Sequence, residues 1–268
     1  MYHEFLTFYE LKKAAFNVTS NPDFFFESRS HKEAISSLMF GIQERKGIIL
    51  ITGEVGTGKT TLCKALFGKL PPEVKISLIL NPYFSEVQLL KAIAEDFGLV
   101  IKDANRLDIV KAINSFLMDL NLNNGNAVLV IDEAQDLSAR QLEQIRLLSN
   151  LETKEEKLLQ IVLVGQPELK EKISKYNLRQ VYQRIIVKHH LTPLRDDEVM
   201  EYINFRLAKV GRGSVVIPQE VYKMIYEFSK GIPRLINILC ERALILGFIR
   251  QEHVLTEEIF STCIEEIK

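Results

Sequence analysis

Residues 53–60 restrict what this chain can fold into more than any other segment. They read G-E-V-G-T-G-K-T, match the pattern G-x-x-x-x-G-K-[ST], and follow the apolar run at residues 48–51. The order is typical of a strand that runs into a phosphate-binding loop, whose glycines let backbone N–H groups turn toward an anion. A helix must follow, and residues 62, 63, 66, 67 and 70 are apolar at helical spacing.

The predicted ligand of this loop is a nucleoside triphosphate with magnesium. Lys59 is predicted to reach the β- and γ-phosphates, and the Thr60 hydroxyl is predicted to coordinate Mg²⁺. The nucleotide-binding residues expected here are Gly53, Glu54, Val55, Gly56, Thr57, Gly58, Lys59, Thr60 and Thr61.

Composition indicates a globular chain and gives no general attraction to nucleic acid. Of 268 residues, 47% are hydrophobic and 26% charged, and the formal net charge is only −1. Cys63, Cys240 and Cys263 form no C-x-x-C pair, so we interpret them as reduced residues of a cytoplasmic protein. No run approaches 18 apolar residues and the N-terminus lacks a signal-peptide pattern, so neither a transmembrane helix nor a signal peptide is expected.

The hydrophobic pattern predicts an α/β domain followed by a helical domain. Apolar stretches at residues 48–51, 75–80, 127–131 and 158–164 alternate with helical periods, and residues 185–189 form a fifth candidate strand. Four strands buried on both faces imply a parallel sheet between helix layers. Beyond Pro193 only helical periods remain. The predicted domains are therefore 1–192, with residues 1–29 as an aromatic segment laid over the α/β domain, and a helical lid at 193–268.

Three serines are predicted to begin helices through capping boxes. Ser30 is followed three residues later by Glu33, and Ser85 and Ser138 are each followed by a glutamine at that spacing.

Polar residues directly after two predicted strands are candidates for chemistry. Asp132 and Glu133 follow the third strand, and Gln166 follows the fourth. The carboxyl ends of parallel strands are where such sheets bind ligands. We expect Asp132 to hold Mg²⁺, Glu133 to polarise the water that attacks the γ-phosphate, and Gln166 to hydrogen-bond that water or the phosphate. The alternative is that these side chains are solvated polar residues at strand ends.

Several longer motifs give the chain a family resemblance. They are GEVGTGKTT at 53–61, VIDEAQDL at 130–137, LLSNLET at 147–153 and VGQPEL at 164–169. These resemble the AAA+ ATPases, in particular the bacterial secretion-ATPase group typified by general secretion pathway protein A (ExeA-like). The resemblance covers nearly the whole chain and continues through LRQ at 178–180, QRI at 183–185 and GIPRLIN at 231–237.

The resemblance implies a five-stranded sheet ordered 5-1-4-3-2, a helical lid, and a ring in which nucleotide lies between neighbouring subunits. Lys59 and Thr60 match the Walker A positions, and Asp132 and Glu133 match Walker B. Gln166 falls in the sensor 1 region, where many AAA+ proteins have Asn or Thr.

Two arginines match further functional positions of the family. Arg184, just before the fifth strand, matches the arginine finger, and Arg234 in the lid matches sensor 2 and would also bind nucleotide. A guanidinium suits both positions because it stays charged and its planar fork can bind two phosphate oxygens. Surface salt bridges are the alternative for both residues.

The leading functional hypothesis is an ATP-hydrolysing AAA+ protein that performs conformational work on a protein partner, as in the assembly of secretion or pilus machinery. One alternative is a DNA-associated helper ATPase of the transposition or loader type, which the net charge does not favour. Another is a nucleotide-dependent switch or scaffold that hydrolyses ATP weakly. We expect a homo-oligomer in the ATP state and a cytoplasmic location, with peripheral attachment to the inner membrane through a partner left open. Secretion members of the group commonly continue into a transmembrane segment, whereas this sequence stops at Lys268.

Overall fold

A computed structural model describes residues 2–102, 105–211 and 213–267. By its contacts the chain divides into two compact units, which we describe separately. The sheet unit contains Lys32–Glu54 and Leu62–Leu191. The helical unit contains Met1–His31, Val55–Thr61 and Thr192–Lys268.

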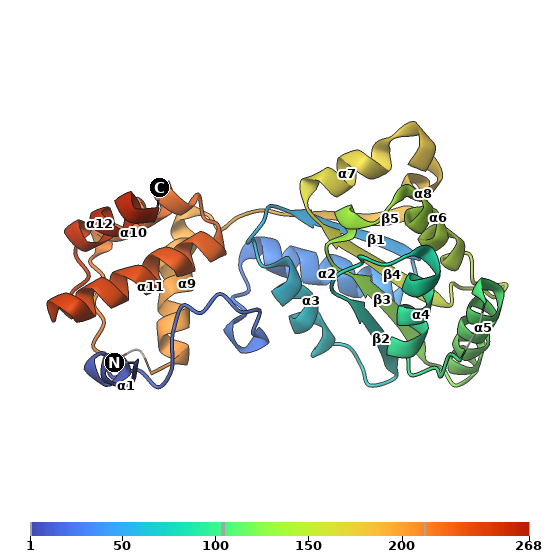
Figure 1. Cartoon of the computed structure of the whole chain (residues 1–268), viewed down its shortest axis with the longest axis horizontal. Coiled ribbons are helices and arrows are strands. Elements are labelled where there is room, and N and C mark those ends of the chain that lie inside the picture. Colours follow the sequence, from blue (N-terminus) through green and yellow to red (C-terminus); the bar gives the residue numbers. More distant parts are fainter. Residues whose placement is uncertain (1, 103–104, 212, 268) are drawn as a thin grey trace. The chain divides into compact units, whose positions relative to one another are not determined.

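The sheet unit is built on five parallel strands (Figure 1). They are β1 (Ile48–Gly53), β2 (Val74–Ile79), β3 (Asn126–Ile131), β4 (Leu159–Gly165) and β5 (Ile185–Leu191). Their order in the sheet is β2-β3-β4-β1-β5, which confirms the predicted order. Because all five are parallel, their carboxyl ends share one edge, so β1, β3 and β4 deliver their following loops to the same side of the unit.

Burial separates the central strands from the edge strands. Every residue of β1 and β4 is buried, as are five of the six residues of β3. We expected the second strand to be buried on both faces as well, and this was wrong, because β2 lies at an edge of the sheet and buries only Ser77 and Ile79. Fewer neighbouring side chains cover the faces of the sheet beside an edge strand, so its side chains are more exposed than those of the central strands.

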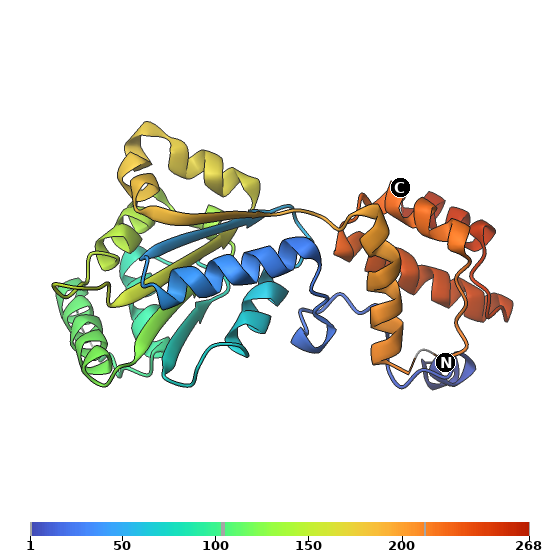
Figure 2. The ribbon, with the colours of Figure 1, turned by 180° about the vertical axis from the view of Figure 1, so that it is seen from behind.

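Helices cover both faces of the sheet. Five helices belong wholly to the sheet unit: α4 (Glu86–Asp96), α5 (Arg106–Leu122), α6 (Ala139–Leu148), α7 (Pro167–Ser174) and α8 (Arg179–Gln183). Two others, α2 (Arg29–Gln43) and α3 (Lys59–Phe67), belong to it except for their first three residues. Figure 2 shows α2 running across one face. It packs so closely there that a Cβ on Gly41 would lie 2.5 Å from Ile49 Cδ1, so only glycine fits without repacking.

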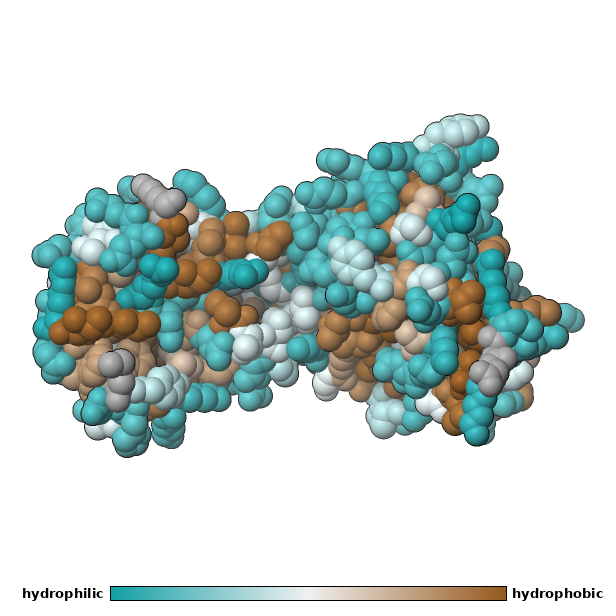
Figure 3. Space-filling model, viewed as in Figure 1, coloured by the Kyte–Doolittle hydropathy of each residue, from teal (hydrophilic) through white to brown (hydrophobic). Residues whose placement is uncertain are grey.

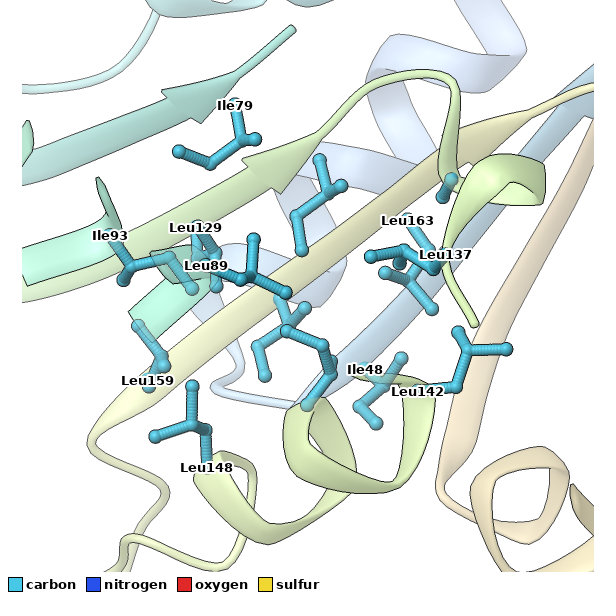
Figure 4. Close-up of a cluster of buried hydrophobic side chains, with 14 of the residues drawn as sticks. Ile48, Ile79, Leu89, Ile93, Leu129, Leu137, Leu142, Leu148, Leu159 and Leu163 are labelled. Atoms are coloured by element: carbon cyan, nitrogen blue, oxygen red, sulfur yellow. The ribbon is translucent and has the colours of Figure 1, made fainter. Parts of the chain in front are cut away.

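The opposite face carries the main core of the sheet unit. Side chains of β1, β3 and β4 pack against those of α4 and α6 (Figure 4). Ile48, Leu129 and Leu163, for example, are fully buried. Burying one such side chain stabilises the fold by roughly 1.5–3 kcal/mol, so this cluster supplies much of the unit's stability.

The helical unit combines the C-terminal helices with the N-terminal segment. Its elements are α1 (Tyr2–Phe8), the short 3₁₀ helix η1 (Pro22–Phe24), α9 (Asp196–Lys209), α10 (Gln219–Ser229), α11 (Pro233–Arg250) and α12 (Glu257–Ile267). We grouped residues 1–29 with the α/β domain, but in the structure Tyr9, Phe16 and Phe24 pack into the core of the C-terminal helices. Those aromatic residues have no clean period, so the local pattern did not reveal which core would bury them. The boundary between residues 192 and 193 remains a prediction.

A buried arginine holds the N-terminal segment to α9. Arg206 is only 5% exposed. Its Nε donates to the carbonyl oxygen of Ala15 (2.7 Å) and its Nη2 to that of Asn17 (2.9 Å), while Nη1 donates to the Tyr202 hydroxyl (2.9 Å). These bonds satisfy a charge that would be costly to bury alone. Chain segments almost two hundred residues apart are therefore joined in one unit.

Two of the three expected capping boxes form. Ser85 begins α4 and Ser138 begins α6, each with the reciprocal side-chain bonds of a capping box. Ser30 does not cap a helix, because α2 already begins at Arg29 and the His31 N–H donates to the Ser28 hydroxyl (3.3 Å). The Ser30 hydroxyl instead accepts a hydrogen bond from the Thr192 N–H (3.0 Å).

The visible surface is mostly hydrophilic with smaller hydrophobic areas (Figure 3). Within residues 2–102, 105–211 and 213–267, no helix combines the length and apolarity that crossing a membrane requires.

Candidate functional site

The phosphate-binding motif forms a loop between β1 and α3. Gly53 is the last residue of β1, and Lys59 is the first residue of α3. Gly56 and Gly58 adopt φ angles of +84° and +97°, which side-chain-bearing residues rarely adopt. A Cβ on Gly56 would also lie 2.7 Å from the Cβ of Arg234, so both the backbone and the space require glycine there.

The loop contacts the first turn of α11. The Arg234 N–H donates to the carbonyl oxygen of Gly56 (3.2 Å), and Ile232 is the other close neighbour of that glycine. Arg234 itself is exposed. The arginine predicted to sense nucleotide is therefore joined through its backbone to the predicted phosphate loop.

A buried histidine, which no sequence motif indicated, also contacts the loop. His31 is 4% exposed, its Nε2 lies 3.2 Å from the Thr57 carbonyl oxygen, and its Nδ1 lies 2.6 Å from the Ser28 hydroxyl oxygen. A single histidine on an amphipathic helix gives no local signal of such a contact. The preceding Ser28 at N-cap spacing is the one hint that the sequence offers.

The chemistry of the loop fits a phosphate ligand. The glycines with positive φ let the backbone turn closely around a ligand, where a larger side chain would take up the space. The first-turn N–H groups of α3 have no partners within that helix, so they are available to an anion. Lys59 is 6% exposed, and a buried ammonium is stable only beside negative charge or several acceptors. Thr60 follows it in the same turn and carries a hydroxyl suited to a hard cation such as Mg²⁺.

Asp132 and Glu133 follow directly on β3, at the carboxyl edge of the sheet. Asp132 is 3% exposed, and its Oδ1 accepts the Glu133 N–H (2.9 Å). Glu133 has a φ of +49°, in the left-handed region, which costs a residue with a side chain about 1–2 kcal/mol. Strained backbone of this kind concentrates at functional sites.

Gln166 lies beside Glu133, as expected for strands that end at a common edge. Its Nε2 donates to Glu133 Oε2 (3.3 Å). A second glutamine, Gln135, donates to the same oxygen (2.5 Å) and accepts the backbone N–H of Gln166 (3.1 Å). We had not singled out Gln135, because a glutamine after two acidic residues carries no distinctive local signal.

Arg184 lies apart from these groups. It precedes β5, whose first residue pairs with the first residue of β1, so it lies at the edge where the strands begin. β1 has six residues, so about 20 Å of sheet, at ~3.3 Å per residue, separates Arg184 from the edge that carries Asp132 and Glu133. The structure therefore does not bring Arg184 to the other predicted catalytic residues of the sheet unit.

Arg184 lines a basic pocket of about 510 Å³. The lining consists of Arg146, Arg179, Gln180, Gln183 and Arg184. The Arg146 guanidinium makes a two-pronged contact with Glu143, and this hydrogen bonding holds the pKa of the Glu143 carboxyl below its usual value. Arg179 and Arg184 add positive charge beside this ion pair, which favours an anionic ligand.

The fold and the phosphate loop define the class. Residues 42–173 match the family model described as an AAA domain. Together with the 5-1-4-3-2 parallel sheet, this match shows that the chain has the P-loop fold of the AAA+ class.

Within this class the chain is similar to general secretion pathway protein A of Aeromonas hydrophila. The two are 42% identical over 262 residues, which confirms the resemblance drawn from the motifs. The match covers 97% of this chain and 48% of that protein, so the chain spans about half the length of this relative.

Solved structures share the fold at low sequence identity. The Aeropyrum pernix ORC2 protein superposes with a TM-score of 0.69 at 19% identity, over 89% of this chain and 67% of that one. Cdc6p from Pyrobaculum aerophilum gives a TM-score of 0.69 at 15% identity, over 91% of this chain and 70% of that one. At these identities the likeness shows the fold alone.

Proposed function

We propose that this chain binds and hydrolyses ATP and uses the cycle to change the conformation of a protein partner in secretion or pilus assembly. The observation that carries the proposal is the carboxyl edge of one sheet. There, β1 leads into a glycine-turned phosphate loop, while β3 and β4 deliver Glu133 and Gln166 in hydrogen-bond contact. A carboxylate with a polar neighbour on the next strand suits activation of water.

The predicted roles follow from the chemistry of each group. Lys59 and the loop N–H groups would hold the β- and γ-phosphates, and Thr60 and Asp132 would hold Mg²⁺, which neutralises developing charge on the phosphates. Glu133 would accept a proton from the attacking water. Gln166, whose Nε2 also donates to Glu133 Oε2, would hydrogen-bond that water or the γ-phosphate.

Arg184 would act on nucleotide bound to a second copy of the chain. Its position at the opposite edge of the sheet supports this role, because it lies about 20 Å from the carboxyl edge of its own sheet. The pocket that it shares with Arg146 and Arg179 could receive a phosphate presented by a neighbour. A guanidinium there would stabilise negative charge in the transition state. This role requires a homo-oligomer. We expect a closed ring, because in a closed ring every nucleotide site has the Arg184 of a neighbour beside it.

The proposed partner and pathway rest on the similarity to general secretion pathway protein A. The likeness to ORC2 and Cdc6 shows a shared fold and adds nothing to the DNA-associated alternative. A cytoplasmic location, with attachment to the inner membrane through the partner, fits the same proposal.

The proposal is tested with two variants that separate binding from turnover. Lys59→Ala should abolish binding of a fluorescent ATP analogue, because it removes the positive charge that faces the phosphates. Glu133→Gln should keep that binding and lose turnover, by roughly 100-fold or more. If Glu133→Gln bound the analogue no better than Lys59→Ala, the division of roles would be wrong. Wild-type turnover in Glu133→Gln would remove that residue as the base, and a folded wild type that bound without turning over would support the switch alternative.

A further inference from the structure

Gln135 contacts two of the predicted catalytic residues, Glu133 and Gln166. It lies in η2 (Ala134–Asp136), the 3₁₀ turn after Glu133. Both ends of its carboxamide are used: Nε2 donates to Glu133 Oε2 (2.5 Å), and Oε1 accepts the Gln166 N–H (3.1 Å). One side chain therefore joins the end of β3 to the end of β4.

The surroundings of Gln135 are shaped to hold it in this position. A Cβ on Gly165 would lie 2.7 Å from Gln135 Oε1, so glycine at the end of β4 leaves the space that the carboxamide occupies. The Lys172 ammonium, on α7, donates to the Gln135 carbonyl oxygen (2.8 Å) and ties the 3₁₀ turn to that helix. Gln135 is thus held both through its side-chain carboxamide and through its backbone carbonyl.

These contacts involve only one of the two carboxylate oxygens of Glu133. Oε2 accepts from the carboxamides of both Gln135 and Gln166. A carboxylate whose one oxygen is held by two donors keeps a set orientation, and its other oxygen can serve as the acceptor for a proton. The left-handed backbone of Glu133 has the same effect, because it starts the side chain in a defined direction.

We propose that Gln135 is a positioning residue for ATP hydrolysis: it anchors Glu133 Oε2 and the backbone of Gln166 so that Glu133 Oε1 faces the attacking water. This inference rests on the proposed function, in which Glu133 is the base. In this role Gln135 acts through Glu133 and not by binding the nucleotide. The length of the glutamine side chain lets one carboxamide reach both Glu133 Oε2 and the Gln166 N–H.

The test is Gln135→Met, which keeps the length of the side chain and removes both hydrogen bonds. We expect kcat to fall by roughly 10- to 100-fold, as for displacement of a catalytic group by about 1 Å. Affinity for a fluorescent ATP analogue should stay within about twofold of wild type, because the phosphate loop is untouched. The matched control is Gln219→Met at the exposed start of α10, which should leave both quantities unchanged. Thermal unfolding shows whether each variant is folded.

A double-mutant cycle gives a readout that loss of packing alone would not produce. Gln135 and Gln166 share Glu133 Oε2 and bond to each other, so the kcat loss in Gln135→Met/Gln166→Ala should be clearly smaller than the product of the two single losses. If Gln135→Met does not fold, Gln135→Glu is the second variant. It keeps the acceptor for Gln166 but sets a carboxylate against Glu133, and the same loss of kcat is expected.

Wild-type or raised kcat in folded Gln135→Met or Gln135→Glu would overturn the inference, as would single losses that simply multiply. Glu133→Gln, measured in the same assay, separates the two levels of the proposal. If it loses turnover while Gln135→Met does not, only the positioning role fails. If Glu133→Gln itself turns over normally, the proposed base is wrong.

Discussion

The His31 Nε2 atom lies 3.2 Å from the carbonyl oxygen of Thr57, in the middle of the phosphate loop. The Ser28 hydroxyl oxygen lies 2.6 Å from the other ring nitrogen. If Ser28 donates to Nδ1, the ring proton resides on Nε2 and is donated to Thr57. The start of α2 therefore supports a loop that is distant in sequence.

This contact leads to a prediction for nucleotide affinity. In His31→Ala the Thr57 carbonyl loses its donor, which costs about 1–2 kcal/mol, and part of that cost should appear as weaker ATP binding, by up to roughly 30-fold. His31→Gln keeps a donor of similar reach and should recover most of the affinity. Titration with a fluorescent ATP analogue measures both, with His3→Ala on the exposed face of α1 as the control. Unchanged affinity in His31→Ala would show that the loop holds its shape without this bond.

Turnover should depend on contact between subunits. Because Arg184 lies at the far edge of its own sheet, we expect specific activity to rise with protein concentration. Arg184→Ala should lower kcat by about 10³-fold or more, the range for an arginine that stabilises the transition state, while ATP affinity stays nearly intact. Lys75→Ala, on an exposed residue of edge strand β2, is the matched loss of one positive charge.

Mixing two inactive variants tests the same role directly. An oligomer containing Arg184→Ala and Lys59→Ala subunits pairs some intact phosphate loops with an intact Arg184 from a neighbour, so part of the activity should return. No recovery in subunits shown to co-assemble, with wild-type turnover independent of concentration, would exclude action across the subunit boundary.

The stability of the helical unit should depend on the Tyr9 hydroxyl. Tyr9 is fully buried, and its one hydroxyl hydrogen has two acceptors within reach, the carbonyl oxygens of Leu244 (2.9 Å) and Glu252 (3.2 Å). Tyr9→Phe should lower the free energy of unfolding by about 1 kcal/mol, measured by urea unfolding near pH 8. The control, Tyr83→Phe, changes a residue that is 75% exposed and should have no effect.

The stability that Tyr9 contributes should decrease at alkaline pH. Burial, followed by the charge of Glu252, raises the pKa of Tyr9 in the folded state. A group whose pKa is higher in the folded state stabilises the fold fully below its unfolded pKa, about 10 for tyrosine, and less as the pH rises toward the folded value. The difference in unfolding free energy between wild type and Tyr9→Phe should therefore shrink above about pH 10. A constant difference across this range would show that Tyr9 does not titrate with unfolding.

Several features of the carboxyl edge of the sheet could be predicted because their sequence signals are local. The phosphate loop needs glycine at Gly56 and Gly58 for reasons of backbone conformation, and these are visible in eight consecutive residues. Asp132 and Glu133 follow a buried strand directly, so the parallel sheet places them at the ligand-binding edge. The capping boxes at Ser85 and Ser138 formed for the same reason, since each involves residues three positions apart. The individual roles of these site residues remain predictions.

The sequence by itself determined the alternation of strands and helices, the phosphate loop and the acidic pair after β3, because each depends on neighbouring residues. Only the tertiary structure decided that His31 supports Thr57, that Gln135 joins Glu133 to Gln166, and that the N-terminal aromatic residues pack with the C-terminal helices. These contacts form between segments far apart in the chain or at a strained backbone turn. Their geometry depends on how whole elements pack. A short window of sequence does not contain the distant partners or show how far apart the fold will place them.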